Sequence, residues 1–215
     1  MMGDFLLSRA LCLLVDVGNH EALGTVSRAT ERLSQGEIYE FQIAQQRDTQ
    51  ETSYFAMVGD KTASLISASC KIGPYIAGAP KDMVDALGKF GEYLGLAFQI
   101  ADDLLDFTGD PDTMGKPVGN DLREGKITLP LIHALNAASS TERQYVESIL
   151  RREENSDSDW QEVVSFVEKQ NGLSSAGKVA KNYAIKAQEC LEIFEPSPSR
   201  SMLETAARLV VERDN

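Results

Sequence analysis

The stretch GEYLGLAFQIADDLLDFTGDPDTMGKPVGNDLREGKITLPL, residues 91–131, decides how this sequence is interpreted. It begins as an apolar run with helical spacing. It then places three polar residues three, four and seven positions after a glutamine, giving the set Gln99, Asp102, Asp103 and Asp106. Residues at these spacings lie on one face of an α-helix. The stretch therefore predicts a mostly apolar helix with one acidic face.

We expect a cation to bind at the acidic face of this helix. Carboxylates one helical turn apart repel one another, and near the C-terminus of a helix they also oppose the helix dipole. Oxygen ligands suit Mg²⁺, which commonly uses one or two carboxylates and leaves its other positions to water and phosphate oxygens. We therefore predict that the aspartates bind Mg²⁺ together with a diphosphate.

The aspartates have one other open interpretation. They can form a solvated helix end that leads into the turn at Gly109-Asp110-Pro111. A calcium-binding EF-hand loop is excluded, because no register through residues 102–112 supplies both the glycine at the sixth position and the glutamate at the twelfth. The solvated helix end therefore stays open as the structural alternative.

Two lysines follow the aspartates in unusual settings. Lys116 lies between a glycine and a proline, and Lys126 follows a glycine just before a helix that is expected to begin near Thr128. Lysines that face a metal–carboxylate cluster complete a site for a multiply charged phosphate. Taken alone, such a lysine is more often a solvated surface residue, so this interpretation depends on the aspartates.

Several short motifs carry a family resemblance. FQIADDLLDFTGD, MGKP, NDLREGK and TLPL follow one another in this order, and Asp60-Lys61-Thr62-Ala63 lies upstream. In order and spacing, the first four resemble the second aspartate-rich motif of the trans-polyprenyl diphosphate synthases, and the upstream residues look like that family's KTA motif. Similarity of lower specificity covers nearly the whole chain.

The resemblance implies a Mg²⁺-dependent prenyltransferase. Such an enzyme ionises an allylic diphosphate, lets the double bond of isopentenyl diphosphate attack the cation, and releases a proton. The residues whose roles the resemblance implies are Asp102, Asp103 and Asp106 for Mg²⁺, Lys61, Lys116 and Lys126 for diphosphate, and Lys61, Thr62 and Gln99 for catalysis. It also implies an apolar cavity for the prenyl chain, and association as a homodimer or as a heteromer with a related synthase.

The composition limits the kind of protein. A chain of 215 residues can bury a full core, and we expect a single domain over residues 1–215. The formal charge of -12 argues against nucleic acid as a partner and makes a bridging metal more necessary for binding diphosphate. Three isolated cysteines fit the reducing cytoplasm, and no apolar run is long enough to span a membrane.

Lys61 lies in the middle of a predicted helical stripe. The helix is expected to begin near Asp48, which has capping-box spacing to Glu51. A lysine that faces the core loses hydration, which is costly unless an anion or hydrogen bonds compensate. Lys61 therefore indicates a bound anion. The alternative is that its side chain extends along the bundle edge to reach water.

The segment from Glu21 to Gln46 is predicted to be an amphipathic helix. Its apolar stripe can continue in two ways towards the C-terminal end. Either Glu37 and Glu40 point inward and line a cavity, or the stripe drifts so that Ile38 and Phe41 make the core contacts. We prefer the drift, because it keeps apolar residues in the core.

The remaining pattern is helical throughout. We expect a buried helix over Phe5–Val17, a kink or break at Gly73-Pro74, and a long helix over Lys81–Phe107 whose glycines allow close packing. No long β-type alternation occurs. The sequence therefore predicts an all-α fold, and the resemblance implies a helical bundle of the isoprenoid-synthase type.

Capping signals predict the boundaries of the later helices. Ser139 with Glu142 has the spacing of a capping box. The same spacing is found from Asp159 and from Ser201, so helices are expected to begin at all three positions. Gly172 is predicted to end a helix.

One part of the family pattern is missing. The family's first aspartate-rich motif and the arginine pair after it do not occur in this sequence, which is expected to match a synthase truncated at its N-terminus. Three explanations stay open: an inactive fragment, a noncatalytic subunit that partners a complete synthase, or a protein that binds a prenyl diphosphate without turnover. A terpene cyclase is disfavoured, because residues 120–124 lack the metal-binding spacing of that class.

Overall fold

The computed structural model describes residues 2–109, 115, 117–152 and 154–212, and every regular element in these ranges is helical. The all-α prediction is therefore confirmed. The elements in chain order are α1 (Met2–Val17), α2 (His20–Gln46), α3 (Glu51–Val58), η1 (Gly59–Ala63), α4 (Ser64–Ile76), α5 (Lys81–Thr108), α7 (Asn120–Arg123), α8 (Leu129–Ala137), α9 (Ser140–Leu150), α10 (Asp157–Lys169), α11 (Gly172–Glu189) and α12 (Pro198–Val211).

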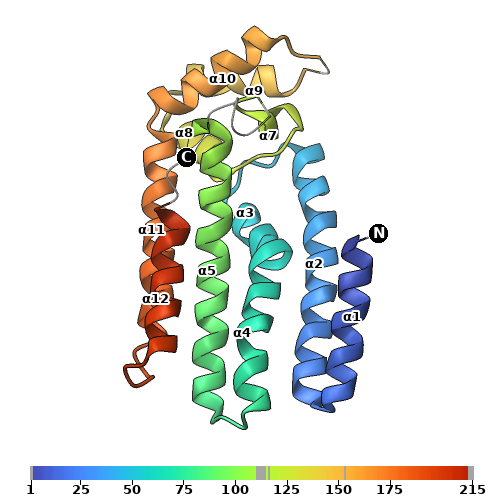
Figure 1. The fold of residues 1–215 in the computed structure, drawn as a ribbon. Helices are drawn as coiled ribbons and strands as arrows, with labels where there is room; N and C mark the ends of the chain where they lie inside the picture. The colour runs from blue at the N-terminus through green and yellow to red at the C-terminus, as the bar shows by residue number, and fades with distance from the viewer. Residues whose placement is uncertain (1, 110–114, 116, 153, 213–215) are drawn as a thin grey trace.

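The long helix α5 is the centre of the bundle. It packs against α4 on one side and against α11 on the other, and α12 also contacts it (Figure 1). Helix α2 packs against α4 and η1, and α1 lies along the outer side of α2. The shorter helices α7 to α10 gather at the end of the bundle where α5 terminates. The aspartates of α5 are therefore carried to the junction between the long and the short helices.

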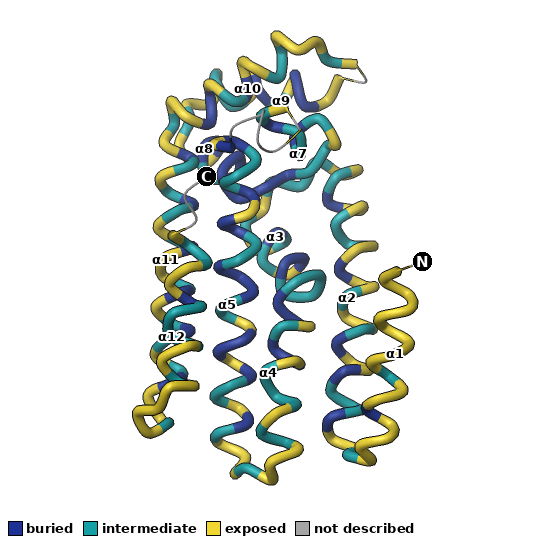
Figure 2. The backbone as a smooth tube through the Cα atoms, viewed as in Figure 1, coloured by how far each residue is buried: buried dark blue, intermediate teal, exposed yellow. Residues whose placement is uncertain are grey.

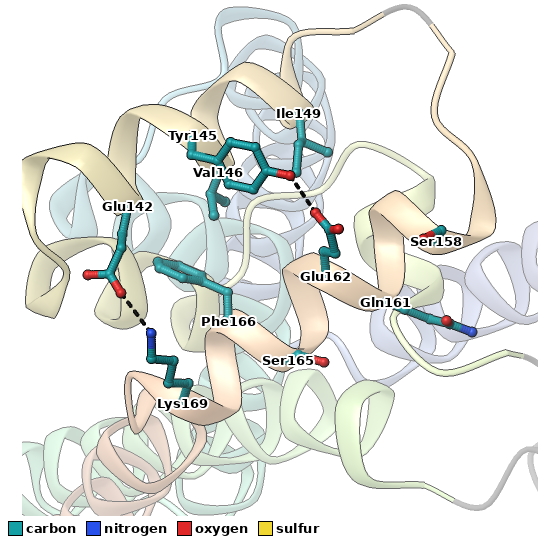
Figure 3. Close-up of a pocket in the computed structure, with 10 residues that line it drawn as sticks. All are labelled: Glu142, Tyr145, Val146, Ile149, Ser158, Gln161, Glu162, Ser165, Phe166 and Lys169. Carbon is teal, nitrogen blue, oxygen red and sulfur yellow. Dashed lines mark hydrogen bonds and ion pairs between the residues drawn. The ribbon is translucent and has the colours of Figure 1, made fainter.

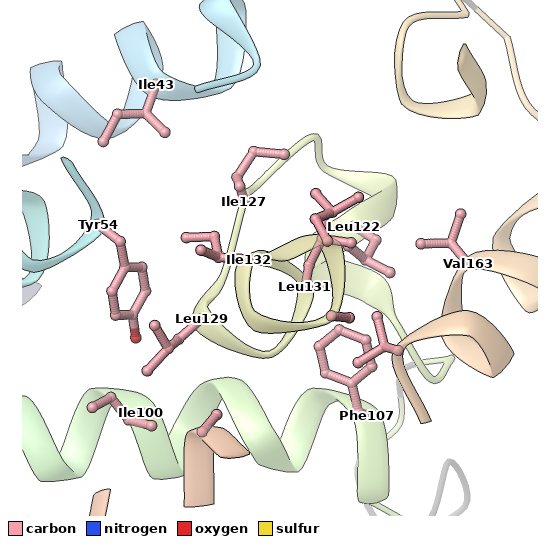
Figure 4. Packing of buried hydrophobic residues seen from close by; sticks show 14 of the residues in the cluster. Ile43, Tyr54, Ile100, Phe107, Leu122, Ile127, Leu129, Leu131, Ile132 and Val163 are labelled. Atoms are coloured by element: carbon pink, nitrogen blue, oxygen red, sulfur yellow. The ribbon is translucent and has the colours of Figure 1, made fainter. Parts of the chain in front are cut away.

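The main hydrophobic core lies at this junction (Figure 4). Helix α8 supplies Leu129, Leu131 and Ile132, all at most 1% exposed, because its sequence is apolar on nearly every side. A helix that is apolar all round is stable only when it is surrounded. Tyr54 of α3 and Ile100 of α5 pack around it. This core fixes the end of α5 relative to α3 and to the segment that precedes α8.

The segment η1 is a π-helical turn held between two glycines. A Cβ atom added at Gly36 of α2 would lie 2.4 Å from the backbone nitrogen of Lys61, and one added at Gly95 of α5 would lie 2.6 Å from the Cα of Ala63. Only glycine allows backbones to approach this closely. The prediction that the glycines of the long helix serve close packing is confirmed. Single π turns inside α-helices occur frequently at functional sites.

Helix α1 contradicts one prediction. It was expected to be buried, but Leu14 is its only buried residue within the described range. Phe5, Leu6 and Val15 are 60–63% exposed, and Figure 2 shows exposed residues along most of the helix. The reason is geometric, because α1 contacts α2 on one side and is too apolar for a single contact face to cover.

The preferred stripe of α2 is also wrong. Ile38 and Phe41 are 61% and 63% exposed, whereas Glu40 is partly buried and hydrogen-bonded to Lys61. The less favoured alternative is therefore observed for Glu40, which lines a cavity, but not for Glu37, whose side chain is 54% exposed. The buried Gly36 sets the orientation, because its contact with η1 turns the residue one helical turn later towards the interior.

The helix starts are partly as predicted. The capping box of Ser139 and Glu142 is present, and Thr128 is the N-cap of α8, so both are confirmed. The starts at Asp159 and Ser201 are wrong by three and four residues respectively, because nearby serines act as the N-caps. Those serines are Ser156, which forms a capping box with Asp159, and Ser197, which accepts a hydrogen bond from the backbone of Arg200.

Three further boundaries differ. Helix α3 begins at Glu51 without a side-chain cap, because Asp48 instead accepts hydrogen bonds from the backbone of Gln50 and from Ser53. Gly172 starts α11, and the left-handed backbone at the preceding turn belongs to Asn171, with φ 58°. The break that was the second possibility at Gly73-Pro74 is not found, because α4 continues through Pro74 to Ile76, and the kink stays a prediction.

The long helix over 81–107 is confirmed, with α5 ending one residue later. No helix in the part of the chain that the structure describes has both the length and the apolar character needed to cross a membrane.

Candidate functional site

A cavity of about 310 Å³ lies where α2, η1 and α5 meet the segment before α8. It brings together five of the residues predicted from the sequence, namely Lys61, Gln99, Asp102, Asp103 and Lys126. Six further residues complete the wall: Glu40, Ile43, Met57, Asp121, Ile127 and Thr128. Residues far apart in the chain therefore converge here, and the wall combines carboxylates, ammonium groups and apolar side chains.

Asp103 is the most buried acid of the site, with 4% exposure. Its carboxylate accepts a hydrogen bond of 2.6 Å from the Tyr54 hydroxyl and one of 2.9 Å from the Gln99 amide. Gln99 in turn accepts a hydrogen bond of 2.8 Å from the Thr62 hydroxyl. This network links η1, α3 and α5. It holds the predicted residues Thr62 and Gln99 in one chain of contacts with Asp103.

The network leaves Asp103 with a perturbed acidity. Burial raises the pKa of Asp103 to about 7, while the hydrogen bonds from Tyr54 and Gln99 act in the opposite direction. Burial, and then the negative charge of Asp103, raise the pKa of Tyr54 well above its usual value, so its hydroxyl stays a donor. A carboxyl group that is desolvated beside other acids is stabilised as an anion when a cation binds.

Asp102 and Asp106 lie on either side of this network. Asp102 is exposed and lines the cavity, and within the described residues its carboxylate makes no hydrogen bond or ion pair. Asp106 is half-buried and accepts a hydrogen bond of 3.1 Å from the backbone of Asp121. Burial and the charge of Asp121 raise the pKa of Asp106 to about 6. Asp106 therefore contacts the backbone of α7 and does not itself line the cavity.

Each described lysine of the cavity is held by two carboxylates. The Lys61 ammonium lies 2.6 Å from Glu40 and 3.6 Å from Glu37. The Lys126 ammonium lies 2.8 Å from Asp121 and 2.8 Å from Glu124. Partial burial acts to lower the pKa of Lys126, but the hydrogen bonds that its ammonium group donates to the two acids outweigh this effect and raise the pKa above its usual value. Both lysines are therefore already paired with carboxylates of the protein.

The charges of the cavity wall do not balance. Four carboxyl groups line it, from Glu40, Asp102, Asp103 and Asp121, against the two amino groups of Lys61 and Lys126, so the acids outnumber the lysines with or without Asp103. A bare diphosphate would add further negative charge to a wall that is already acidic. Divalent cations would reverse this balance, so the wall suits an anion that arrives together with metal.

The donor set fits Mg²⁺ that is shared with a phosphate ligand. No three Asp, Glu, His or Cys residues in the described ranges are grouped closely enough to form a complete protein site for a metal. Mg²⁺ does not require one, because it commonly binds one or two carboxylates and fills its other positions with water and phosphate oxygens. Asp102 and Asp103 supply such oxygens at the cavity. The predicted phosphate ligand Lys116 lies outside the described residues.

Sequence reasoning missed three residues of this site. Tyr54 was not predicted to belong to the site, although a buried tyrosine hydroxyl usually needs a partner. Asp121 was treated only as part of a motif. Thr128 was treated as a cap, yet it is 5% exposed and its hydroxyl has no hydrogen-bond partner among the described residues. No spacing rule connects these three positions to α5.

A second, shallower cavity of about 500 Å³ lies between α9 and α10 (Figure 3). The Tyr145 hydroxyl donates to Glu162 at 2.6 Å, and Lys169 pairs with Glu142 at 2.9 Å, so two contacts join the helices across it. None of the residues predicted to bind metal or diphosphate lines this cavity. The acidic cavity beside α5 is therefore the candidate site.

An all-helical bundle with aspartates and lysines around one cavity defines a protein of the isoprenoid-synthase type. Residues 1–167 match the polyprenyl synthetase family, and the chain belongs to that family. It is 35% identical over 213 residues to all-trans-nonaprenyl-diphosphate synthase (geranyl-diphosphate specific) of Rhodobacter capsulatus, covering 99% of this chain and 65% of that protein. It is 32% identical over 212 residues to heptaprenyl diphosphate synthase component 2 of Geobacillus stearothermophilus, covering 99% and 65%.

The fold has equally close counterparts among solved structures. A polyprenyl synthase from Caulobacter crescentus, complexed with calcium and isoprenyl diphosphate, superimposes with a TM-score of 0.90 at 34% identity, covering 98% of this chain and 64% of that one. The chain thus spans about two-thirds of the length of the relatives that it matches.

Proposed function

We propose that this protein is a prenyltransferase that joins isopentenyl diphosphate to an allylic diphosphate and forms a polyprenyl diphosphate. The observation that carries the proposal is the convergence of Lys61 and Lys126 on the cavity that Asp102 and Asp103 also line. This combination provides for both a divalent cation and a diphosphate. The names of the relatives and the isoprenyl diphosphate in one related structure support the same substrate class.

Asp102 and Asp103, with Asp106 one turn further along α5, would hold Mg²⁺. When bound, Mg²⁺ neutralises the charge that accumulates on the departing diphosphate. Gln99, Thr62 and Tyr54 keep the Asp103 carboxylate in place through the hydrogen bonds described above.

Lys61 and Lys126 would donate hydrogen bonds to diphosphate oxygens from two walls of the cavity, and Lys116 would do the same from the intervening segment. The chemistry requires electrostatic stabilisation of a leaving group rather than a nucleophilic side chain. Ile43, Met57 and Ile127 supply the apolar part of the wall, against which the first prenyl unit would lie.

Association with a second chain belongs to the same proposal. Exposed apolar residues along α1, among them Phe5 and Leu6, provide a surface for a homodimer or for a heteromer with a related synthase. One relative is itself named as a component of a synthase, which supports the heteromer. A noncatalytic subunit is therefore the second candidate.

The isolated thiols of the three cysteines fit a cytoplasmic location.

Binding is tested first by thermal unfolding with Mg²⁺ and inorganic pyrophosphate. A ligand selective for the folded state raises the melting temperature, so the two ligands together should raise it more than either alone. Asp102→Asn should reduce this rise, because it removes an oxygen charge from the cavity. Asp85→Asn is the matched control, since Asp85 is exposed on the same helix away from the site. An equal rise in both variants would contradict the assignment of Asp102.

Catalysis is tested with labelled isopentenyl diphosphate, an allylic primer and Mg²⁺, using the chain alone and mixed with a full-length homologue. Turnover by the chain alone supports the enzyme. Turnover that rises only on mixing supports the noncatalytic subunit. Binding without turnover in either case would contradict both and leave a prenyl-diphosphate-binding protein.

A further inference from the structure

The ion pair between Glu40 and Lys61 occupies the lysine that the proposed function assigns to diphosphate. Glu40 lies 2.6 Å from the ammonium group, and the two side chains are 22% and 25% exposed. Glu37 is also near, at 3.6 Å, but it is 54% exposed and does not line the cavity. The close and partly desolvated partner of Lys61 is therefore Glu40.

The position of Glu40 is set by the backbone rather than by side-chain flexibility alone. Gly36 packs directly on the backbone of Lys61, and Glu40 follows it by one helical turn on the same face of α2. Helix α2 continues without interruption through both residues. A carboxylate is thus placed next to Lys61 wherever α2 contacts η1, and it lies on the cavity wall.

This placement affects any anion that enters. A phosphate oxygen that bonds to Lys61 must displace Glu40 or share the lysine with it, and in either case it approaches a negative charge. When the binding-competent form of the protein, here the one with Lys61 released from Glu40, is only partly populated, the apparent affinity for the ligand falls by that fraction. An anion accompanied by divalent cations avoids most of this cost, because the cations offset the carboxylate charge.

We propose that Glu40 is a specificity-determining residue that makes the cavity select metal-complexed diphosphate over free phosphate anions. This inference rests on the proposed function, because it takes Lys61 to be a diphosphate ligand. Specificity of this kind is a difference between two affinities, and it is obtained here by placing a repulsive group against the unwanted ligand. Free phosphate anions would otherwise compete for Lys61.

Lys126 has a comparable pair of acids, Asp121 and Glu124, on the opposite wall. The backbone of Asp121 also donates a hydrogen bond to Asp106, and the charge of the Asp121 side chain acts on that carboxyl group, so a substitution there would affect a residue proposed for Mg²⁺ as well as Lys126. Glu40 has no such contact to the aspartates of α5 in the described part of the chain. A substitution of Glu40 therefore tests the pairing with Lys61 without a direct effect on the proposed Mg²⁺ ligands.

The experiment measures the affinity of the whole chain for inorganic pyrophosphate by calorimetry, once with Mg²⁺ and once with a chelator. Glu40→Gln keeps the shape and a hydrogen-bond acceptor but removes the charge. It should raise the metal-free affinity about tenfold and change the affinity with Mg²⁺ much less. Glu37→Gln is the matched control and should change both affinities by less than about twofold.

A double-mutant cycle with Lys61→Met tests whether Glu40 acts through Lys61. In that background, Glu40→Gln should no longer raise the metal-free affinity, because the lysine it released is gone. Circular dichroism verifies that each variant is folded, and Glu40→Ala replaces Glu40→Gln if that variant is not. A general structural effect of Glu40 would instead persist in the Lys61→Met background and would overturn the proposal.

The failures of the two proposals are distinguishable. If Lys61→Met weakens binding of Mg²⁺–pyrophosphate but Glu40→Gln leaves the metal-free affinity unchanged, the role of Glu40 is wrong and the diphosphate site stands. If Lys61→Met has no effect on binding in Mg²⁺, the diphosphate role of Lys61 is wrong and the inference falls with it.

Discussion

The Tyr54 hydroxyl holds together the least solvated part of the site. It is the donor closest to Asp103, and Tyr54 itself is 1% exposed, so water cannot replace it without rearrangement of the core. A buried acceptor left without its donor carries its full desolvation penalty. The geometry of the Asp103 carboxylate therefore depends on a residue that belongs to the hydrophobic core.

We predict that Tyr54→Phe lowers the free energy of unfolding by about 1–3 kcal/mol, because it leaves one oxygen of Asp103 unsatisfied. Urea unfolding measures this change. Tyr39→Phe is the matched control, since Tyr39 packs against the same core and its hydroxyl makes no hydrogen bond within the described residues. Equal losses in the two variants would show that the hydroxyl of Tyr54 has no special role.

At the scale of residues, the sequence identified the site only where chemistry and spacing coincided. The aspartates of α5 and Lys61 carry motifs, so their meeting at one cavity could be anticipated. Glu40 could be considered but was not preferred, because the rule that apolar residues face the core favoured Ile38 and Phe41. That rule failed since Gly36 fixes the rotation of α2 through a backbone contact, which periodicity does not reveal.

Among the elements, η1 and its glycine contacts decide where Lys61 points. We predict that Gly36→Ala lowers the free energy of unfolding by about 1–3 kcal/mol, because its Cβ would overlap the backbone of Lys61. Gly177→Ala in α11 is the control. Its Cβ would make an ordinary contact 3.8 Å from Leu104, so it should stabilise the protein by about 0.5–1 kcal/mol.

Urea unfolding of both glycine variants provides the measurement. If Gly36→Ala were as stable as Gly177→Ala, the close approach of α2 to η1 would not exist in solution. A second readout is the affinity for Mg²⁺–pyrophosphate, which should fall in Gly36→Ala and stay unchanged in Gly177→Ala.

The capping box of α9 makes the stability of the protein depend on pH in the acidic range. Hydrogen bonds from Ser139, followed by the contact with Lys169, lower the pKa of Glu142 from 4.5 to about 2. A carboxyl group with a lowered pKa in the folded state stabilises that state above the unfolded pKa, and this contribution is lost as the pH falls from 4.5 towards 2.

We predict that Glu142→Gln lowers the urea midpoint at pH 7 and that its difference from the unmodified chain shrinks as the pH approaches 2. Urea titrations at a series of pH values measure this difference. Glu154→Gln, in the loop before α10, serves as the control and should show no such trend. A difference that stays constant with pH would contradict the role of the Glu142 charge.

The secondary structure was the easiest part to predict, because α5 and α8 have strong apolar patterns and clear boundaries. The errors lie at caps where two serines or acids compete. Ser156 and Asp159 both stood close to the start of α10, and only the three-dimensional arrangement shows which one bonds to the free backbone groups. The exposure of α1 could not be predicted, because the sequence of an apolar helix does not specify which other elements cover it.

At the scale of the whole molecule, helix α1 exposes an apolar face in the described structure. We predict that the chain associates in solution, and that the double substitution Leu6→Glu and Leu13→Glu lowers its average mass, because both residues are at least 50% exposed on α1. Sedimentation equilibrium measures the mass. Leu209→Glu on α12, which is 55% exposed, is the control and should leave the mass unchanged. A chain that is monomeric at every concentration would contradict this.

The expectation of one domain over residues 1–215 stays a proposal. It is supported by the contacts of α5 with helices that precede and follow it in the chain, from α3 and α4 to α11 and α12, while α2 joins the bundle through α4 and η1. Because these contacts share one central helix, calorimetric unfolding should show a single transition, and two separate transitions would contradict a single domain.

The π turn at residues 59–63 interrupts an otherwise continuous helix and changes the rotational direction of the side chains that follow it. Each residue of an α-helix advances the side-chain direction by about 100°, so a widened turn resets which side of the following helix faces its neighbours. Deleting one residue here would rotate Ser67 away from the Gly88 carbonyl that it contacts at 2.8 Å. The number of residues between Lys61 and the part of α4 that packs against Gly88 and Gly91 therefore cannot change, even by one.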